Sequence, residues 1–360
     1  MYNDRDWYDK FNGFYSSRMI GNETNRHKSP INPIYVGFKV TEKCNQHCKH
    51  CWAGKSIIEK SLIDITTAFD KLRAFNVFHM TITGGEPFLR NDCFDIITYA
   101  KKTFPVVEIF TNAVLLDDNI ISKLKDILTK HDFFQVSLDG LRNSYMLQRG
   151  TDSYYTVLEN IKKLVVSGMN VRVNMTATSY NLNDIVNVYN KCVEMGCHTF
   201  SISYVVPIRK GKDVRVLTSI EKYGKIIKEL EAQHNKNDNK ITLRTFIPIE
   251  IKSVQAKQNY NEKTTFFNDN ILHWTIDAEG NIYNFLDHYL HPELKIGNIY
   301  MDDIEIINES NFSVQKKILY RSFDKEKCAR CSLLNSCQGG SYIENYPNIN
   351  IADRRCLANV

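Results

Sequence analysis

The sequence contains no long uninterrupted apolar run, no block of basic residues, no internal repeat and no low-complexity segment. A membrane-spanning helix needs about 18 or more apolar residues in succession, so a transmembrane protein is excluded. The 46 basic and 41 acidic residues are dispersed and give a net charge of only +5, which does not support nucleic-acid binding. The first ten residues lack the apolar segment of a secretory signal, so we expect a cytoplasmic protein.

Cysteine is the residue type that the sequence has in unusual number. The hydrophobic fraction of 43% and the charged fraction of 24% are ordinary for a globular chain of 360 residues, but there are ten cysteines. Disulfides are rare in a reducing compartment, and seven of the ten thiols fall into two tight clusters at opposite ends of the chain. Clustered thiols in an intracellular protein predict metal binding.

Strand-like and helical segments alternate over the first two thirds of the chain. The hydrophobic pattern predicts strands at 34–40, 77–83, 106–111, 133–138, 171–177 and 200–205, and helices at 61–75 and from about 91, 117, 153, 183 and 219. Six such units require parallel strands joined by right-handed crossovers, in either an open doubly wound sheet or a barrel. Beyond residue 241 the chain is more irregular, with a hairpin expected at 274–285. We therefore expect an N-terminal extension (1–33), an α/β core (34–238) and a C-terminal domain (239–360).

The first cysteine cluster directly follows the first predicted strand. Cys44, Cys48 and Cys51 have the spacing C-x3-C-x2-C, which places three thiolates on one short loop. Structural zinc sites usually take four protein ligands, whereas three thiolates suit an iron–sulfur cube with one iron left open. His47 and His50 are the alternative fourth ligands, but they are too close in sequence to form a second ligand pair.

This loop resembles the signature of the radical S-adenosylmethionine (SAM) enzymes, and later motifs match that family in order. Thr83 to Pro87 (TGGEP) resembles the family's GGEP loop, which holds the amino group of SAM. Val136 to Gly140 (VSLDG) and the pair Arg149-Gly150 are similar to further family motifs. The resemblance covers about residues 34–210, with a further match at the C-terminus. It identifies the chain as a member of the family with a partial (β/α)6 TIM-like barrel and a smaller C-terminal α+β auxiliary-cluster domain.

The resemblance implies specific roles for the residues of these motifs. Cys44, Cys48 and Cys51 would bind a catalytic [4Fe–4S] cluster whose open iron holds SAM. Gly84, Gly85 and Glu86 would position SAM, with Glu86 accepting from its ammonium group. Arg149 would meet its carboxylate. Ligands in α/β folds bind at the carboxyl ends of strands, and this placement adds Asn112, Ser137 and Asn174 as candidate cofactor contacts.

The sequence departs from the family pattern at two places near these motifs. The residue before the last cysteine of the loop is often aromatic in relatives, and here it is His50, although Trp52 lies close by. Relatives often carry a His-Asp pair before the Arg-Gly pair, where this chain has Tyr145 and Met146. The imidazole of His50 can still stack on adenine, whereas the family's substrate contacts are not assigned to Tyr145 and Met146.

The second cysteine cluster lies at the C-terminal end of the chain. Cys328, Cys331, Cys337 and Cys356 supply four thiolates, which from spacing alone suit either zinc or a fully ligated [4Fe–4S] cluster. The segment resembles the SPASM extension of radical SAM enzymes, which carries auxiliary clusters. Two positions where that family has cysteines hold Phe285 and Ser341, and no cysteine occurs between Cys197 and Cys328. This joint loss predicts one auxiliary [4Fe–4S] cluster, and two clusters in all.

The resemblance implies an enzyme that cleaves SAM reductively to a 5′-deoxyadenosyl radical and abstracts a substrate hydrogen atom. The expected substrate is a ribosomally made peptide, which would be crosslinked, oxidised or epimerised. The expected partners are that peptide and a low-potential electron donor such as a flavodoxin or ferredoxin, with no nucleic acid and no membrane. One alternative is a small-molecule dehydrogenase or epimerase, or a tetrapyrrole-modifying enzyme. An alternative of a different class is a zinc-stapled binding protein without catalytic activity.

Overall fold

The computed structural model describes residues 32–52, 59–205, 209–213, 215–238, 240–245, 273–284, 288, 291–319 and 348. Its strands are β1 (Tyr35–Thr41), β2 (His79–Gly84), β3 (Val106–Thr111), β4 (Phe133–Ser137), β5 (Asn170–Ala177), β6 (Thr199–Tyr204), β7 (Thr242–Thr245), β8 (His273–Ile276), β9 (Asn281–Tyr283) and β10 (Lys295–Asn298). Its α-helices are α2 (Leu62–Ala74), α3 (Cys93–Thr103), α4 (Asp118–Ile127), α5 (Arg142–Arg149), α6 (Tyr154–Val166), α7 (Ile185–Glu194), α8 (Ile220–Lys236) and α10 (Ile304–Leu319).

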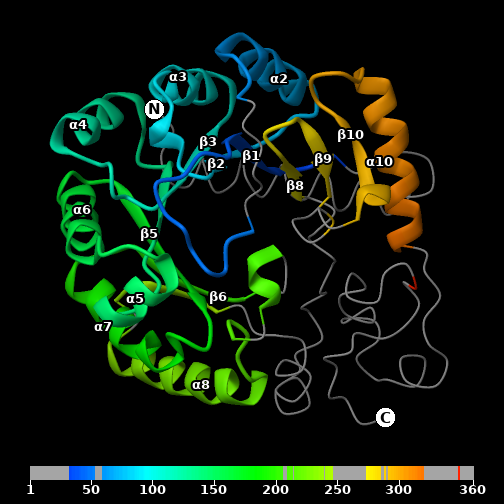
Figure 1. Cartoon of the computed structure of the whole chain (residues 1–360). Coiled ribbons are helices and arrows are strands. Elements are labelled where there is room, and N and C mark those ends of the chain that lie inside the picture. Colours follow the sequence, from blue (N-terminus) through cyan, green and yellow to red (C-terminus); the bar gives the residue numbers. More distant parts are fainter. Residues whose placement is uncertain are drawn as a thin grey trace.

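All of these strands belong to one sheet, in the order β10-β9-β8-β1-β2-β3-β4-β5-β6-β7. Strands β1 to β7 are parallel from each neighbour to the next. The helices follow one another around the outer side of the curved sheet, and β7 and β10 are the sheet's edges within the described residues (Figure 1). The predicted partial (β/α)6 barrel is therefore confirmed.

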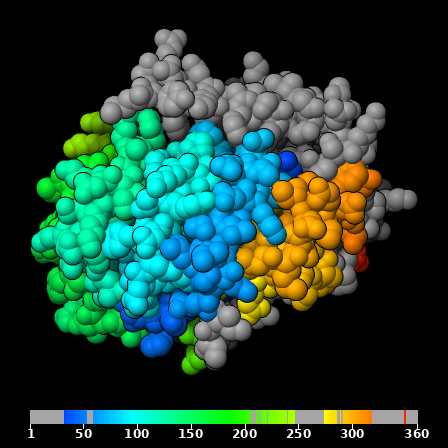
Figure 2. Space-filling view, turned by 90° about the horizontal axis from the view of Figure 1, so that it is seen from above, coloured from blue at the N-terminus to red at the C-terminus, as the bar shows by residue number. Residues whose placement is uncertain are grey.

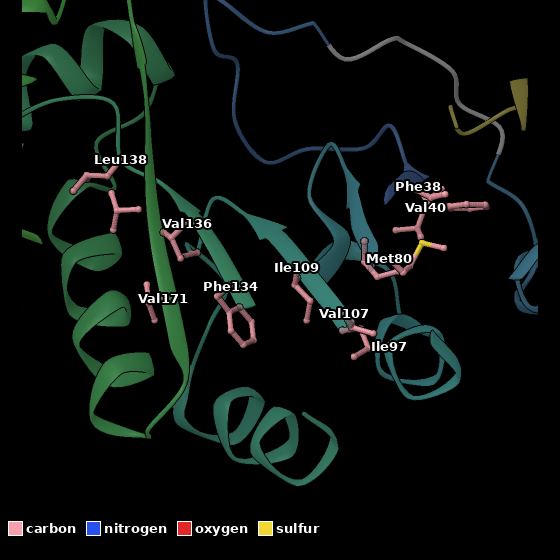
Figure 3. Packing of buried hydrophobic residues seen from close by; sticks show 14 of the residues in the cluster. Phe38, Val40, Met80, Ile97, Val107, Ile109, Phe134, Val136, Leu138 and Val171 are labelled. Carbon is pink, nitrogen blue, oxygen red and sulfur yellow. The ribbon is translucent and has the colours of Figure 1, made fainter. Parts of the chain in front are cut away.

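The two faces of the parallel sheet have opposite character. Alternate strand residues are buried against the helices, as Figure 3 shows for Phe38, Met80, Ile109, Phe134 and Val171. Burial of such side chains stabilises the fold by about 1.5–3 kcal/mol each. The intervening residues make a polar inner face. Successive side chains of a strand point to opposite faces of the sheet, so one face is apolar and the other polar.

Polar contacts on this inner face join β3 to its neighbour β2 and, across β4, to β5. The Glu108 carboxylate of β3 lies 2.6 Å from Arg172 Nη1 of β5 and 3.1 Å from His79 Nε2 of β2. Such buried charges must be paired, and here they tie together the ends of the strands opposite the cysteine loop.

The C-terminal strands extend the sheet on the free edge of β1. Strand β8 pairs with β1 in parallel, with Tyr35 opposite His273, and the β8–β9–β10 part is antiparallel. The space-filling view shows this segment and α10 lying against α2 (Figure 2), where Lys71 Nζ donates to the carbonyl oxygens of Ile299 and Asp302 at 3.0 Å. The hairpin predicted at 274–285 is confirmed by β8 and β9.

Several elements were not expected from the sequence. These are the short helix α5, the strand β7, the strand β10 and the helix α10. Strand β7 pairs with β6 beyond residue 238, so the parallel sheet continues past the expected boundary between core and C-terminal domain. The division into 1–33, 34–238 and 239–360 stays a prediction. Among the described residues, no helix combines the length and the apolar character needed to cross a membrane.

His273 gives the joined strands a pH dependence that is open to measurement. Burial lowers its pKa from 6.5 to about 4. The unfolded chain therefore binds a proton between these pH values that the folded chain does not bind, and stability is lost as the pH falls through this window. Between pH 7 and pH 5 we expect the free energy of unfolding to fall by about 1–2 kcal/mol more in the wild type than in His273→Gln. Urea unfolding at both pH values measures this, and an equal pH dependence of the two proteins would contradict it.

Candidate functional site

The cysteine loop follows β1 and is held at the carboxyl ends of the strands by the loop after β2 and by the last turn of α5. On one side, the backbone N–H groups of Gly85 and Glu86 donate to the carbonyl oxygens of Thr41 and Lys43, both at 2.8 Å. On the other side, the N–H of Lys49 donates to the carbonyl of Gln148 at 2.8 Å. These backbone hydrogen bonds fix the path of the cysteine loop, and the path of the loop sets where its three thiols lie.

The two glycines of the TGGEP segment allow this close approach. A β-carbon at Gly84 would lie 2.2 Å from the carbonyl oxygen of Thr41, and one at Gly85 would lie 2.1 Å from that of Lys43. Gly84 also has a φ of +152°, which favours glycine. The contact that demands glycine at both positions is therefore with the start of the cysteine loop, and their contact with SAM stays a prediction.

The Glu86 carboxylate is buried and surrounded by donors from the protein itself. It accepts from Thr111 Oγ1 at 2.8 Å, from the backbone N–H of Asn112 at 2.7 Å and from that of Phe88 at 3.3 Å. Burial raises its pKa to about 7. In this arrangement Glu86 ties the loop after β2 to the end of β3, and it fixes the backbone of Asn112.

The side chain of Asn112 in turn contacts the cysteine loop. Its Nδ2 donates to Asn45 Oδ1 at 2.7 Å and lies 3.8 Å from Cys44 Sγ. The amide of a strand-end asparagine thus points an N–H group at the first thiol of the loop.

A buried ion pair lies beside the second thiol. Arg149 Nε is 2.6 Å from Asp139 Oδ2, and Arg149 Nη1 lies 3.6 Å from Cys48 Sγ and 3.3 Å from Gln46 Oε1. The other oxygen of Asp139 accepts from the backbone N–H of Thr176 at 2.7 Å. Arg149 is brought to the site as the resemblance implies, but the groups that it contacts here are a carboxylate and a thiol of the protein.

The network extends from Gln46 to residues that sequence reasoning missed. Gln46 Nε2 donates to the Tyr145 hydroxyl at 2.9 Å, and that hydroxyl lies 3.0 Å from Ser153 Oγ. Tyr145 occupies a position where relatives often have a different pair, and its departure from the family pattern was the only signal in the sequence. Gln46, inside the cysteine motif, carried no signal of its own.

The three thiols form a donor set whose electrostatics can be examined directly. Burial raises the pKa of Cys44, and it raises the pKa of Cys48 to about 11. Each of these two thiolates is also destabilised by the negative charge of Cys51. A cationic group that binds these sulfurs would offset the cost of making Cys44 and Cys48 anionic, and N–H donors directed at sulfur are a regular feature of iron–sulfur sites. The chemistry of this donor set fits a cluster bound through three thiolates.

No group of three or more His, Cys, Asp or Glu side chains among the described residues is close enough to hold one metal ion. The three cysteines are therefore not arranged as the ligands of a single ion. A cubic cluster binds each thiolate at a different iron, so its ligands need not converge on one point.

The two histidines of the loop lie in different surroundings. His50 Nε2 is 3.6 Å from Asp139 Oδ2, and burial lowers the pKa of His50 to about 4, so the ring is neutral near pH 7. The Nδ1 atom of His50 is buried without a hydrogen-bond partner. His47 is exposed and lines a surface cavity.

Ser137 and Asn174 lie side by side on neighbouring strands, Ser137 as the last residue of β4 and Asn174 within β5. They are register partners of β4 and β5, and Asn174 Oδ1 accepts from Ser203 Oγ of β6 at 3.1 Å. Both are half-buried and alternate with buried apolar residues, which places them on the polar inner face. Their contact with a cofactor stays a prediction. The second cluster, Cys328, Cys331, Cys337 and Cys356, lies outside the described residues.

Comparison with known proteins gives a family match over the region that contains this site. The sequence model of the Radical SAM superfamily matches residues 38–192. The antilisterial bacteriocin subtilosin biosynthesis protein AlbA of Bacillus subtilis is 28% identical over 227 residues, which are 58% of this chain and 50% of AlbA. The AdoMet-dependent heme synthase of Methanosarcina barkeri is 26% identical over 188 residues, 50% of this chain and 53% of that protein. The chain thus matches about half the length of these curated relatives.

The fold of the chain is also similar to a solved structure. Streptococcus suis SuiB bound to S-adenosylmethionine matches with a TM-score of 0.80 at 16% identity, covering 99% of this chain and 84% of that one. SuiB bound to its precursor peptide SuiA matches with a TM-score of 0.79, also at 16% identity, over 97% of this chain and 81% of that one. At this level of identity the likeness concerns the fold.

Proposed function

Since residues 38–192 belong to the radical SAM superfamily, we propose that the protein is an enzyme that cleaves SAM reductively and modifies a ribosomally made peptide. The observation that carries the proposal is the cysteine loop itself. Its three thiols lie in the matched region, and N–H groups of Asn112 and Arg149 are directed at two of them.

In this proposal Cys44, Cys48 and Cys51 hold a [4Fe–4S] cluster. When bound, the cluster supplies the electron that splits SAM into methionine and a 5′-deoxyadenosyl radical, which removes a hydrogen atom from the substrate. Hard radical chemistry of this kind belongs to the cofactor, and the protein contributes binding and orientation.

The residues around the loop then have distinct tasks. Asn112 and Arg149 would donate to the Sγ atoms of Cys44 and Cys48, while Glu86 and Asp139 hold these two donors in place. Gly84 and Gly85 bring their loop against the cysteine loop, next to the expected place of the SAM amino group. Ser137 and Asn174, on the polar inner face, are the proposed polar contacts of SAM.

The C-terminal part completes the proposal. Residues 239–360 would form a SPASM-like domain, with a second [4Fe–4S] cluster on Cys328, Cys331, Cys337 and Cys356 that transfers electrons. The electron donor would be a flavodoxin or ferredoxin of the cytoplasm, where low-potential clusters and free thiols persist.

A peptide is the proposed substrate because proteins similar to this chain act on peptides by name. AlbA is a bacteriocin biosynthesis protein, and SuiB is solved with its precursor peptide. A tetrapyrrole is the second candidate, since the similarity to the heme synthase is comparable.

Anaerobic reconstitution with iron and sulfide tests the cofactors. We expect about eight iron and eight sulfide per chain in the wild type, and about four of each after Cys44→Ala, Cys48→Ala and Cys51→Ala are combined. With dithionite and SAM, the wild type should release 5′-deoxyadenosine and the triple variant should release none. Cys93→Ala, which removes a buried thiol of α3 outside the loop, is the matched control and should keep both properties. Zinc without sulfide would reject the proposal in favour of a zinc-stapled protein.

Mass spectrometry of a co-expressed peptide tests the substrate. A short reading frame encoded beside this one supplies the candidate, and the wild type should change its mass while the triple variant does not. A mass change that persists in the triple variant contradicts the mechanism. Turnover of a porphyrin, with no change in the peptide, would favour the second candidate.

A further inference from the structure

A polar cavity of about 400 Å³ opens beside the cysteine loop. It is lined by His47, Lys49, Tyr180, Lys210, Asp213 and Arg215. These residues come from the cysteine loop, from the loop after β5 and from the segment between β6 and α8. The volume lies within the range of small-ligand sites, and three of its six lining side chains are cations.

Among the described residues, the only carboxylate that lines this cavity is already paired. Asp213 accepts from Arg215 Nε with both of its oxygens at 3.0 Å, and from Arg215 Nη2 at 2.6 Å. The backbone N–H of Arg215 donates to it as well, at 2.9 Å. These hydrogen bonds hold the pKa of Asp213 near 2, so it stays charged with its hydrogen bonds directed to Arg215. Lys49 and Lys210 add two further positive charges to the lining of the cavity.

Lys49 is held in place by contacts that leave its charge available. Its backbone is bound to Gln148, and its ammonium lies 4.5 Å from the centre of the Tyr180 ring. A cation over an aromatic face keeps its ability to pair with an anion. Because His47 and Lys49 flank Cys48 in the sequence, this cavity borders the cysteine loop.

We propose that this cavity binds an acidic side chain of the peptide substrate, a glutamate or aspartate close in sequence to the residue that reacts. The proposal rests on the function proposed above and names the substrate class for it. The excess of positive charge selects a carboxylate, and the open side of the cavity admits a side chain carried on a longer chain. Lys49 and Lys210 would bind the carboxylate, and the Asp213–Arg215 pair forms part of the lining.

The test compares two synthetic fluorescein-labelled peptides, one alternating glycine with glutamate and the other alternating glycine with glutamine. Fluorescence anisotropy measures their binding to the anaerobically reconstituted protein with SAM present. Two exposed ion pairs should give the glutamate peptide about five- to tenfold tighter binding, and the preference should shrink as salt is raised. Lys210→Glu should abolish the preference. Lys162→Glu, the same charge change at an exposed position of α6, should leave it intact.

Release of 5′-deoxyadenosine without peptide separates this proposal from the proposed function. If Lys210→Glu releases it at the wild-type rate and has lost the preference for glutamate, the cavity is the peptide-binding site. Equal binding of the two peptides to the wild type overturns the proposal about the cavity and leaves the cofactor chemistry standing. Weaker SAM binding in Lys210→Glu, with the peptide preference unchanged, assigns the cavity to SAM and overturns the proposal as well.

Discussion

Replacing Asp139 by asparagine is expected to lower the free energy of unfolding by about 3–5 kcal/mol. The carboxylate of Asp139 is fully buried and lies 2.6 Å from Arg149, which is itself buried. Asparagine keeps the shape and can still accept from the Thr176 N–H, but it leaves the guanidinium as an uncompensated charge in the interior. Removing one partner of a buried pair is costly for this reason, even where the intact pair contributes little.

A double-mutant cycle separates the charge effect from loss of packing. Arg149→Met removes the cation and should cost a similar amount, whereas Asp139→Asn with Arg149→Met should cost clearly less than the sum of the two. Urea unfolding of the metal-free chain under reducing conditions measures all four proteins. Additive losses would show that the two charges do not stabilise one another, which would contradict the ion pair seen in the structure.

Replacing Gly85 by alanine is expected to displace the cysteine loop and to destabilise the protein by about 2–4 kcal/mol. The new β-carbon would meet the Lys43 carbonyl oxygen at 2.1 Å and the Glu42 carbonyl oxygen at 2.7 Å. Both contacts are with backbone, which cannot rotate away as a flexible side chain can. Because the same backbone leads directly to Cys44, iron content after reconstitution should fall together with stability.

Gly37→Ala is the matched control for this substitution. Gly37 lies inside β1, and a β-carbon there would make only ordinary contacts, the nearest at 3.7 Å from His273 Nε2. Both substitutions remove the same freedom from the unfolded chain, so the difference between them reports on the folded state. We expect Gly37→Ala to stay within about 1 kcal/mol of the wild type and to keep its iron. Similar losses in both variants would refute the role assigned to Gly85.

The repeating part of the fold could be predicted from sequence because periodicity reports burial. Strands such as Val106–Thr111 and helices such as Leu62–Ala74 bury one face, and their patterns are strong. The helix Arg142–Arg149 has a mostly polar sequence, and it is held by the burial of Tyr145, Gln148 and Arg149 and ended by Gly150 at a φ of +72°. Strand Thr242–Thr245 is short, and its residues alternate between exposed and half-buried. Its hydrophobic pattern is therefore weak, and its pairing with β6 is what defines it as a strand.

The candidate site shows the same division between local pattern and tertiary contact. The cysteine spacing and the TGGEP segment are local features, and the sequence reveals them directly. That Arg149 meets Asp139 and Cys48, and that Glu86 is enclosed by donors from β3, depends on how three loops pack. From sequence, Asp139-Gly140 is also typical of an ordinary turn. Its ion pair with the buried Arg149 is what distinguishes Asp139 from a simple turn residue.

The pairing of β1 with β8 has a consequence for synthesis on the ribosome. The strand that leaves the ribosome first among those described receives its second neighbour only when His273 follows Tyr35, 238 positions later (273 − 35). At about 5–20 residues per second, one edge of β1 waits on the order of 10 to 50 seconds for its partner. During that interval its unpaired N–H and C=O groups offer a template to any other extended chain.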